Sequence, residues 1–361
     1  MEVGRTCELC PRRCGVPRGE GFCGAPAELQ VSSVCLHRGE EPPISGQTGI
    51  VNVFFSHCNL QCIYCQNWQI SGVQSGEWRV ESGERRVESG ERRVESGERR
   101  VESGERRAES GERREESGEW RVESGERRVE SGEWRAESAE TLAESICDTL
   151  SSVPSSNTTP SVGFVTAAHY IDRIPAIVEE IRRRGFSPTF VYNSSGYESI
   201  EALQTLDGYI DVYLPDLKYM DADIAARYSH APDYPQVAVA ALLEMRRQVG
   251  GGLKMGDDGM AYRGMLVRHL VLPGAVQNAI ACLDWLADNM PFSTGVSLMA
   301  QYFPPRPGLP APLDRRLTQQ EYDEAVDYLN RLPFNNVWTQ ELCSQDNYRP
   351  DFSASENPFE R

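Results

Sequence analysis

The sequence predicts an α/β protein in which six strand–helix units form a partial (βα)6 barrel of the TIM type. Two observations carry this prediction. Short apolar runs alternate along the chain with amphipathic segments, and strands that alternate with helices form a parallel sheet with right-handed crossovers. The chain offers six such units, whereas a closed barrel of this type contains eight.

The expected elements follow one another along the chain. Thr318 and Glu321 form a capping box at the start of the last helix. In sheets of this kind the active site lies beyond the carboxyl ends of the strands. The expected strands are 50–55, 162–166, 188–193, 209–216, 265–273 and 294–300, and the expected helices are 139–150, 171–184, 197–206, 235–249, 275–288 and 318–332.

A low-complexity block interrupts the pattern. Residues 75–137 are nine seven-residue units of the type SGERRVE. Most units offer one Val or Ala, whereas a coiled coil needs two apolar positions in seven, and the Gly in each unit costs about 1 kcal/mol of helix propensity. We therefore expect a disordered or loosely helical insertion, with a docking arm as the alternative. The expected domains are a Cys-rich N-terminal segment (1–48), the barrel (49–345) that contains this insertion, and a C-terminal tail (346–361).

Charge and hydropathy exclude several classes of function. The formal net charge of −17 disfavours binding to nucleic acid or to anionic lipid. No apolar run approaches the roughly 18 residues of a membrane span, and the N-terminus MEVGRTCELC lacks the apolar core of a signal peptide. We expect a cytoplasmic protein that has neither nucleic acid nor membrane as a partner.

Cysteines are concentrated near the N-terminus, where eight of the eleven fall within the first 65 residues. A reducing compartment rarely keeps disulfides, so the clustering indicates metal binding. Cys147, Cys282 and Cys343 are scattered and are expected to be small core residues. Cys35 is expected to lie outside any metal site.

The stretch HCNLQCIYCQN at 57–67 directly follows the strand expected at 50–55. Its cysteines, Cys58, Cys62 and Cys65, have the spacing C-x3-C-x2-C. Structural zinc normally has four protein ligands, and the nearby candidate, His57, is the immediate neighbour of Cys58 and points in another direction. Closely spaced thiolates hold iron–sulfur clusters, and three of them leave one iron of a [4Fe–4S] cluster open. We predict such a cluster, with structural zinc and unbound thiols as alternatives.

A second cysteine cluster precedes this loop. Cys7, Cys10, Cys14 and Cys23 have the spacing C-x2-C-x3-C-x8-C on a glycine-rich segment. Four thiols in so short a segment suit a tetrahedral zinc site or an accessory iron–sulfur cluster. The sequence leaves zinc, iron–sulfur and reduced thiols open.

The stretch FSHCNLQCIYCQN resembles the signature loop of the radical S-adenosylmethionine (SAM) enzymes, including Tyr64 before the third cysteine. The stretches CELCPRRCGVPRGEGFCGA, VYNSSGYE, DVYLPDLKYMD and RHLVLPG are similar to radical SAM proteins described as homologues of pyruvate formate-lyase activating enzyme. The resemblance covers essentially everything but residues 75–137. It implies that the open iron of the cluster binds SAM, which is reductively cleaved to a 5′-deoxyadenosyl radical that abstracts hydrogen from a substrate.

Partners also follow from the resemblance. It implies a flavodoxin- or ferredoxin-like electron donor and, as substrate, a glycyl radical enzyme, with another peptide or a small molecule as the alternative. The competing function is a non-catalytic, zinc-stabilised scaffold. Such a scaffold would contain zinc without sulfide.

Polar residues at strand ends are the expected contacts of SAM. The resemblance implies that Lys218 meets the SAM carboxylate with Asp216 orienting it, and that Arg268 pairs with the same carboxylate as a planar donor. The Gly-Gly-Glu motif of the superfamily is absent and VTAAHY (165–170) stands in its place, so His169 is either a pocket contact or a structural histidine. Gln301 and Tyr302 are expected on the substrate side. The cofactor-binding residues expected are His169, Asn193, Ser194, Ser195, Gly196, Asp216, Lys218 and Arg268.

Overall fold

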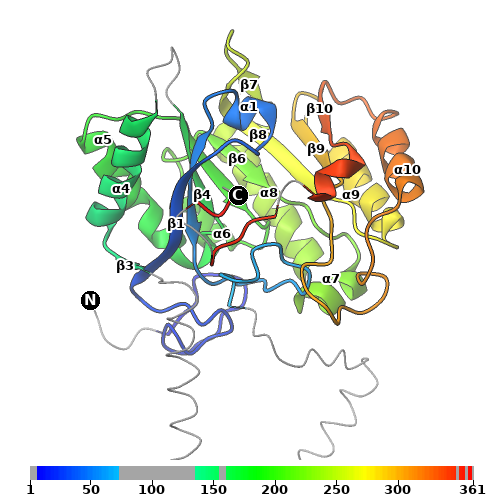
Figure 1. Cartoon of the computed structure of the whole chain (residues 1–361), viewed down its shortest axis with the longest axis horizontal. Coiled ribbons are helices and arrows are strands. Elements are labelled where there is room, and N and C mark those ends of the chain that lie inside the picture. Colours follow the sequence, from blue (N-terminus) through cyan, green and yellow to red (C-terminus); the bar gives the residue numbers. More distant parts are fainter. Residues whose placement is uncertain (1–5, 73–134, 154–159, 347–348, 354–356, 360–361) are drawn as a thin grey trace, which may run out of the picture. The chain divides into compact units, whose positions relative to one another are not determined.

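A mostly parallel β-sheet forms the centre of the structure (Figure 1). The computed structural model describes residues 6–72, 135–153, 160–346, 349–353 and 357–359, which belong to one compact unit. The strands are β1 Leu29–His37, β2 Ile50–Phe55, β3 Arg135–Glu137, β4 Ser161–Val165, β5 Phe190–Ser194, β6 Val212–Pro215, β7 Lys254–Met255, β8 Ala261–Leu270, β9 Gly295–Met299 and β10 Asn336–Thr339.

Pairing along the sheet follows the order β10-β9-β8-β6-β5-β4-β2-β1-β3. Every pair from β2 to β10 along this path is parallel, while β1 runs antiparallel to both β2 and β3. Among the described residues no pairing joins β10 to β3, so the sheet is open. The predicted α/β class is confirmed, and the partial barrel stays a prediction.

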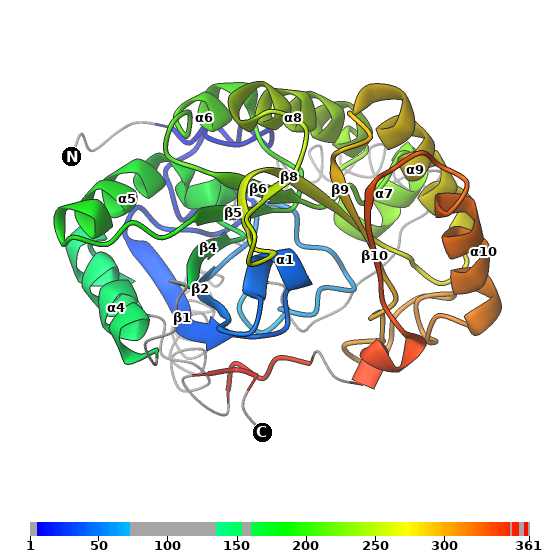
Figure 2. The same ribbon diagram turned by 90° about the horizontal axis from the view of Figure 1, so that it is seen from above.

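Helices cover one side of this sheet. Figure 2 shows α4, α5, α6, α8, α9 and α10 in a row outside the strands, with α1 on the other side. In α5 the buried residues Ile174, Ile177, Val178 and Ile181 fall on one helical face, which explains why this segment packs on the sheet. The helices are α1 Pro42–Ser45, α4 Ala139–Ser152, η2 Ala168–Arg173, α5 Ile174–Arg183, α6 Ile200–Gln204, α7 Ala222–Ser229, α8 Tyr234–Val249, α9 Val276–Asn289, α10 Gln319–Leu329 and η3 Leu342–Asp346.

The sheet begins earlier in the chain than the sequence suggested. β1, Leu29–His37, comes from the segment that was assigned to the Cys-rich N-terminus, and it pairs with β2 along its length. β3, Arg135–Glu137, contains the last residues of the repeat block and pairs with β1. The remainder of the insertion, up to residue 134, lies outside the described residues. The end of the repeat block is therefore part of the sheet.

Most of the scattered cysteines are buried. Cys147 on α4 and Cys282 on α9 are buried, as predicted, and Cys35 is buried in β1. The prediction is wrong for Cys343, which is exposed in the short helix η3. Of the helices that the structure describes, none combines the length and the apolar character that a bilayer span requires.

Candidate active site

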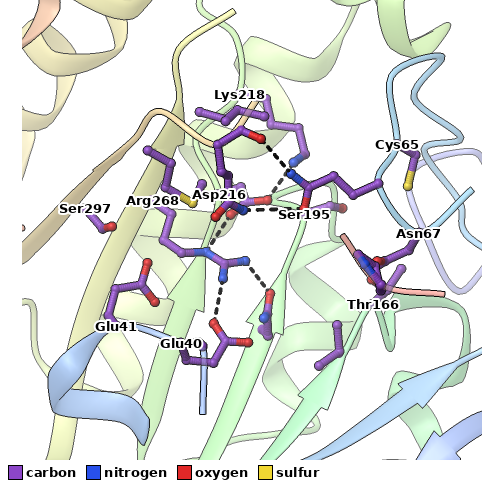
Figure 3. A pocket seen from close by; sticks show the side chains of 18 of the residues that line it. Glu40, Glu41, Cys65, Asn67, Thr166, Ser195, Asp216, Lys218, Arg268 and Ser297 are labelled. Carbon is purple, nitrogen blue, oxygen red and sulfur yellow. Dashed lines mark hydrogen bonds and ion pairs between the residues drawn. The ribbon is translucent and has the colours of Figure 1, made fainter. Parts of the chain in front are cut away.

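A cavity of about 450 Å³ lies at the carboxyl ends of the parallel strands. Cys58, Cys62 and Cys65 reach it from the loop that follows β2. The other predicted residues that line it are Asn193, Ser195, Asp216, Lys218 and Arg268 (Figure 3). Its volume is in the range of small-molecule sites, which is about 300–1,000 Å³. The sheet thus brings most of the predicted site residues to one place.

The backbone of the cysteine loop contains two residues in the left-handed region. His57 has φ 71° and Gln61 has φ 51°, and each directly precedes a cysteine, Cys58 or Cys62. Non-glycine residues rarely adopt this conformation, and it persists only where surrounding contacts hold it. The amide of His57 donates to the carbonyl of Ile70 at 2.6 Å. The loop is therefore folded back sharply at both positions, and its thiols share one cavity.

Hydrogen bonds reach two of these thiols. The amide of Leu60 donates to Cys58 Sγ at 3.4 Å, and Ser229 Oγ donates to Cys62 Sγ at 3.0 Å. Ser229 is in turn 2.8 Å from the hydroxyl of Tyr219, which is 2.6 Å from the hydroxyl of Tyr64. Donors of this kind orient and tune metal-bound thiolates. No sequence pattern indicates the Tyr64–Tyr219–Ser229 hydrogen-bond chain, because its members come from three separate segments.

Burial keeps the free thiols of this loop protonated. It raises the pKa of Cys58 to about 11 and that of Cys65 to about 12, and it also raises the pKa of Cys62. Cysteine binds metal as the thiolate. The positive charge that stabilises these three thiolates therefore has to come from the bound cluster.

No histidine of the described chain stands beside the three thiols as a fourth ligand. His57 uses both ring nitrogens elsewhere: Nδ1 contacts the carbonyl of Cys23 at 3.2 Å and Nε2 contacts Gln30 Oε1 at 2.6 Å. His37 lines the same cavity but pairs with Ile50 at the start of β2, whereas the cysteines follow its end. Six residues of strand separate the two places by roughly 17 Å. The donor set therefore fits a cluster with three protein ligands better than structural zinc.

The spacing of the donors bears on the kind of metal. Within the described part of the chain, no three His, Cys, Asp or Glu side chains form a group that would hold a metal ion. The thiols of the loop instead line a cavity with room for a larger group. A [4Fe–4S] cluster, in which each thiolate binds a different iron, is a group of that kind.

Arg268 lies at the centre of a buried charge network (Figure 3). Its Nε donates to Asp216 Oδ1 at 2.8 Å, its Nη1 to Glu40 Oε2 at 3.1 Å and its Nη2 to Asn193 Oδ1 at 2.6 Å. Lys218 Nζ donates to the other oxygen of Asp216 at 2.6 Å. Every nitrogen of the Arg268 guanidinium thus already has an acceptor within the chain, while the Lys218 ammonium has donors to spare.

The pKa values in this network follow from its charges. Burial alone would lower the pKa of Arg268 and Lys218, but the acidic groups around them, Asp216 foremost, together outweigh burial and raise the pKa of both. Burial would raise the pKa of Asp216, but Arg268 and Lys218 lower it. For Glu41, burial outweighs the charge of the nearby Arg268 and raises the pKa. The network therefore holds Asp216 ionised between two permanent cations.

Glu40 and Glu41 were missed by the sequence interpretation. They precede the short helix α1 and line the cavity, and the Oε2 atom of Glu41 is buried without a hydrogen-bond partner in the described chain. The available signal was the pair of adjacent glutamates directly before Pro42 and Pro43, which would ordinarily indicate only an exposed helix start.

The loop after β5 needs a glycine at position 196, one of the residues predicted to bind the cofactor. Gly196 has φ 79°, and a Cβ atom there would lie 2.5 Å from the carbonyl oxygen of Asp216. Tyr234 joins the two loops, since its hydroxyl is 2.8 Å from the carbonyls of both Ser195 and Asp216. Ser194 faces away and donates to Glu198 at 2.7 Å. Ser194 and Gly196 therefore shape this loop, and Asn193 and Ser195 line the cavity.

His169 lies elsewhere than a SAM contact requires. Its Nε2 donates to the carbonyl of Ser56 at 2.6 Å, and it lines a second, smaller cavity instead of the large one. The stretch VTAAHY passes from β4 directly into the helix η2. This places the imidazole of His169 at the second cavity and not at the large one. Of the two residues expected on the substrate side, Gln301 lines the large cavity, whereas Tyr302 is buried and bonds the carbonyl of Leu313.

All four N-terminal cysteines line that second cavity, which has a volume of about 20 Å³. The structure thus brings together Cys7, Cys10, Cys14 and Cys23, as their spacing suggested, and separates them from the signature loop's thiols.

Comparisons with known proteins add relatives but little chemistry. No family model matches the sequence. The chain is 24% identical over 345 residues to an uncharacterized protein of Methanocaldococcus jannaschii, an alignment that covers 93% of this chain and 78% of that protein. A second uncharacterized protein of the same organism is 32% identical over 79 residues, which cover 18% of this chain and 24% of that protein.

Among solved structures, the chain is similar to a domain of pyruvate-formate lyase-activating enzyme from Bacteroides vulgatus. The TM-score is 0.34 and the identity 9%, and the match covers 48% of this chain and 92% of that chain. At this level of similarity, the function has to be inferred from the site's own geometry.

Proposed function

We propose that the protein is a radical SAM enzyme, which holds a [4Fe–4S] cluster on Cys58, Cys62 and Cys65. The observation that carries the proposal is the convergence of these three thiols on one cavity at the carboxyl ends of the parallel strands, where the neighbouring His57 uses both ring nitrogens elsewhere. The resemblance of the loop to the radical SAM signature supports the same conclusion. When bound, the cluster supplies the single electron for the reductive cleavage of SAM.

The charged residues of the cavity suit the charges of SAM. Lys218 is the better candidate for the SAM carboxylate, since its Nζ donates to Asp216 alone among the described residues, at 2.6 Å, whereas each nitrogen of Arg268 already has an acceptor. Arg268 then acts as the residue that positions Asp216 and Asn193. The carboxylate of Glu40, which accepts from Arg268, provides negative charge for the sulfonium and amino groups of SAM.

The substrate and the electron donor are proposed by resemblance. A flavodoxin- or ferredoxin-like protein would deliver the electron. A glycyl radical enzyme is the proposed substrate, and the hydrogen is abstracted from its backbone. The cavity has room for a small molecule as well as for an extended peptide segment.

Anaerobic purification followed by iron and sulfide analysis tests the proposal. We expect about four irons and four sulfides per chain and formation of 5′-deoxyadenosine from SAM with dithionite as reductant. Cys58→Ala, Cys62→Ala and Cys65→Ala should each abolish 5′-deoxyadenosine formation. Cys147→Ala is the matched control, because this thiol is also buried but lies on α4 outside the cavity.

Two results would contradict the proposal. One is a wild-type protein that contains no sulfide after anaerobic purification and reconstitution. The other is 5′-deoxyadenosine formation that persists in all three signature-loop variants.

A further inference from the structure

The four N-terminal thiols are gathered around one small cavity by the fold of their segment. Cys7, Cys10, Cys14 and Cys23 line this space of about 20 Å³. The backbone turns tightly between them, and a Cβ atom at Gly21 would lie only 3.0 Å from Cys14 Sγ. A larger residue at 21 would push this thiol away from its position. The segment is thus shaped to keep four sulfurs together.

Backbone amides point at two of these sulfurs. The amide of Phe22 is 3.4 Å from Cys14 Sγ, and the amide of Ala25 is 3.5 Å from Cys23 Sγ. Amide donors stabilise the negative charge of a thiolate and are part of the outer shell of metal–thiolate sites. These two amides are placed to donate to metal-bound sulfur.

Three buried polar atoms around the same cavity have no hydrogen-bond partner in the described chain. They are Arg18 Nη1, Asn59 Oδ1 and His169 Nδ1. Buried polar atoms are paired in about 90% or more of cases. Of the three, Arg18 Nη1 is the donor, and it can donate to a negatively charged group in this cavity.

We propose that Cys7, Cys10, Cys14 and Cys23 bind a single zinc ion as four thiolates. The volume favours one ion over a cluster, since about 20 Å³ is little more than the 10–15 Å³ that a water molecule needs. The sulfurs do not yet stand at the spacing of an ion's ligands, so closing them on zinc requires side-chain rotation within the cavity. On binding, the four thiols release their protons and four zinc–sulfur bonds form.

Charge supports this ligand set. Four thiolates and a zinc ion carry a net charge of about −2. Arg12 and Arg18 line the cavity and place positive charge beside it, although Arg18 Nη2 is also paired with Asp172 at 2.9 Å. Buried charges are retained where such partners are present.

A zinc ion bound to these four cysteines would hold the signature loop in its observed conformation. Both left-handed residues of that loop bond to the chain beside Cys23: His57 Nδ1 contacts the carbonyl of Cys23 at 3.2 Å, and Gln61 Nε2 donates to the carbonyl of Phe22 at 2.9 Å. These are the residues that directly precede Cys58 and Cys62. A fixed Cys23 therefore fixes the two sharp turns on which the three-thiol arrangement depends.

Zinc content and zinc coordination in the full-length chain test this proposal. With zinc in the growth medium, we expect about one zinc per chain and an X-ray absorption spectrum with only sulfur neighbours at about 2.3 Å. Cys7→Ala and Cys14→Ala should each lower zinc content at least about tenfold. Cys35→Ala is the matched control, a buried thiol in β1 that lines neither cavity.

The test separates this site from the signature loop. The combined variant Cys58→Ala/Cys62→Ala/Cys65→Ala should keep its zinc, whether or not the proposed radical SAM chemistry is correct. The sulfur-only spectrum of the wild-type protein is an independent measurement that does not depend on whether a cysteine variant folds. A spectrum with nitrogen or oxygen neighbours, a wild type without zinc, or iron and sulfide that depend on Cys7 and Cys14 would overturn the proposal.

Discussion

Two adjacent arginines in the N-terminal segment have different surroundings. Arg12 donates to the carbonyls of Asn59 and Ser229 at 3.0 Å each and also bonds the carbonyl of His230. Arg13 is exposed and lies 3.8 Å from Glu201. Arg12 thus ties the Cys-rich segment to the signature loop and to the end of α7, whose Ser229 bonds Cys62.

Replacing these arginines should have unequal effects. Arg12→Ala should lower the free energy of unfolding by about 2–3 kcal/mol, because buried carbonyls lose a charged donor. Arg13→Ala should change it by less than about 1 kcal/mol, as is usual for an exposed ion pair. Urea unfolding of the two variants measures both values, and equal losses would contradict the assigned role of Arg12.

Glu198 predicts a pH dependence of stability. The carboxyl is buried and accepts from Ser194 Oγ at 2.7 Å, and burial raises its pKa from 4.5 to about 7. A carboxyl with a higher pKa in the folded chain binds its proton more tightly there, so its contribution to stability is full below pH 4.5 and is lost as the pH rises through about 7.

The variant Glu198→Gln should remove this contribution while keeping an acceptor for Ser194. We expect the wild type to lose up to about 3 kcal/mol relative to the variant between pH 5 and pH 8. Chemical denaturation of both proteins at several pH values measures the difference. Parallel stability curves would show that Glu198 is ionised throughout this range.

At the scale of elements, α10 begins with the predicted capping box. Glu321 N donates to Thr318 Oγ1 at 3.3 Å, and Thr318 N donates to Glu321 Oε2 at 3.0 Å. Thr318→Ala should therefore cost about 1 kcal/mol of stability, since it leaves an amide without its acceptor. Thr318→Ser keeps the hydroxyl and is the control, which should stay close to wild type in thermal unfolding.

The elements that the sequence revealed share one property. β2, β4, β5 and β9 are buried along their whole length, and strands covered on both faces appear in a sequence as continuous apolar runs. β1 alternates between buried and half-buried positions and carries two serines, and β10 is only half-buried. Their place in the sheet depends on pairing with neighbours, which a local apolar pattern does not show.

At the scale of the whole molecule, we predict that the repeat insertion can be removed without loss of cluster binding or stability, provided that its last residues, 135–137, are kept. Replacing residues 74–134 by a short Gly/Ser linker should leave iron content, SAM cleavage and the melting temperature close to wild type, because β3 and its pairing with β1 remain. Extending the deletion through residue 137 removes β3 and should lower the melting temperature. If the shorter deletion already loses iron and stability, the repeats are structural.

The sequence by itself determined the chemistry-bearing groups and their order. Three thiols at C-x3-C-x2-C after an apolar strand predicted a site at the strand ends, and parallel-sheet topology then brought Asp216, Lys218 and Arg268 to the same cavity. The shared placement of these residues could be predicted because it rests on local spacing and on a general property of parallel sheets, while their roles stay predictions.

Only the tertiary structure decided which groups face one another. It gave every nitrogen of Arg268 an acceptor within the chain, placed Glu40 and Glu41 in the cavity, and turned His169 toward the N-terminal cysteines. The physical reason is that these contacts join residues far apart in the chain, such as Arg268 and Glu40, 228 positions apart. Their geometry is set by how strands and loops pack, and no local pattern encodes it.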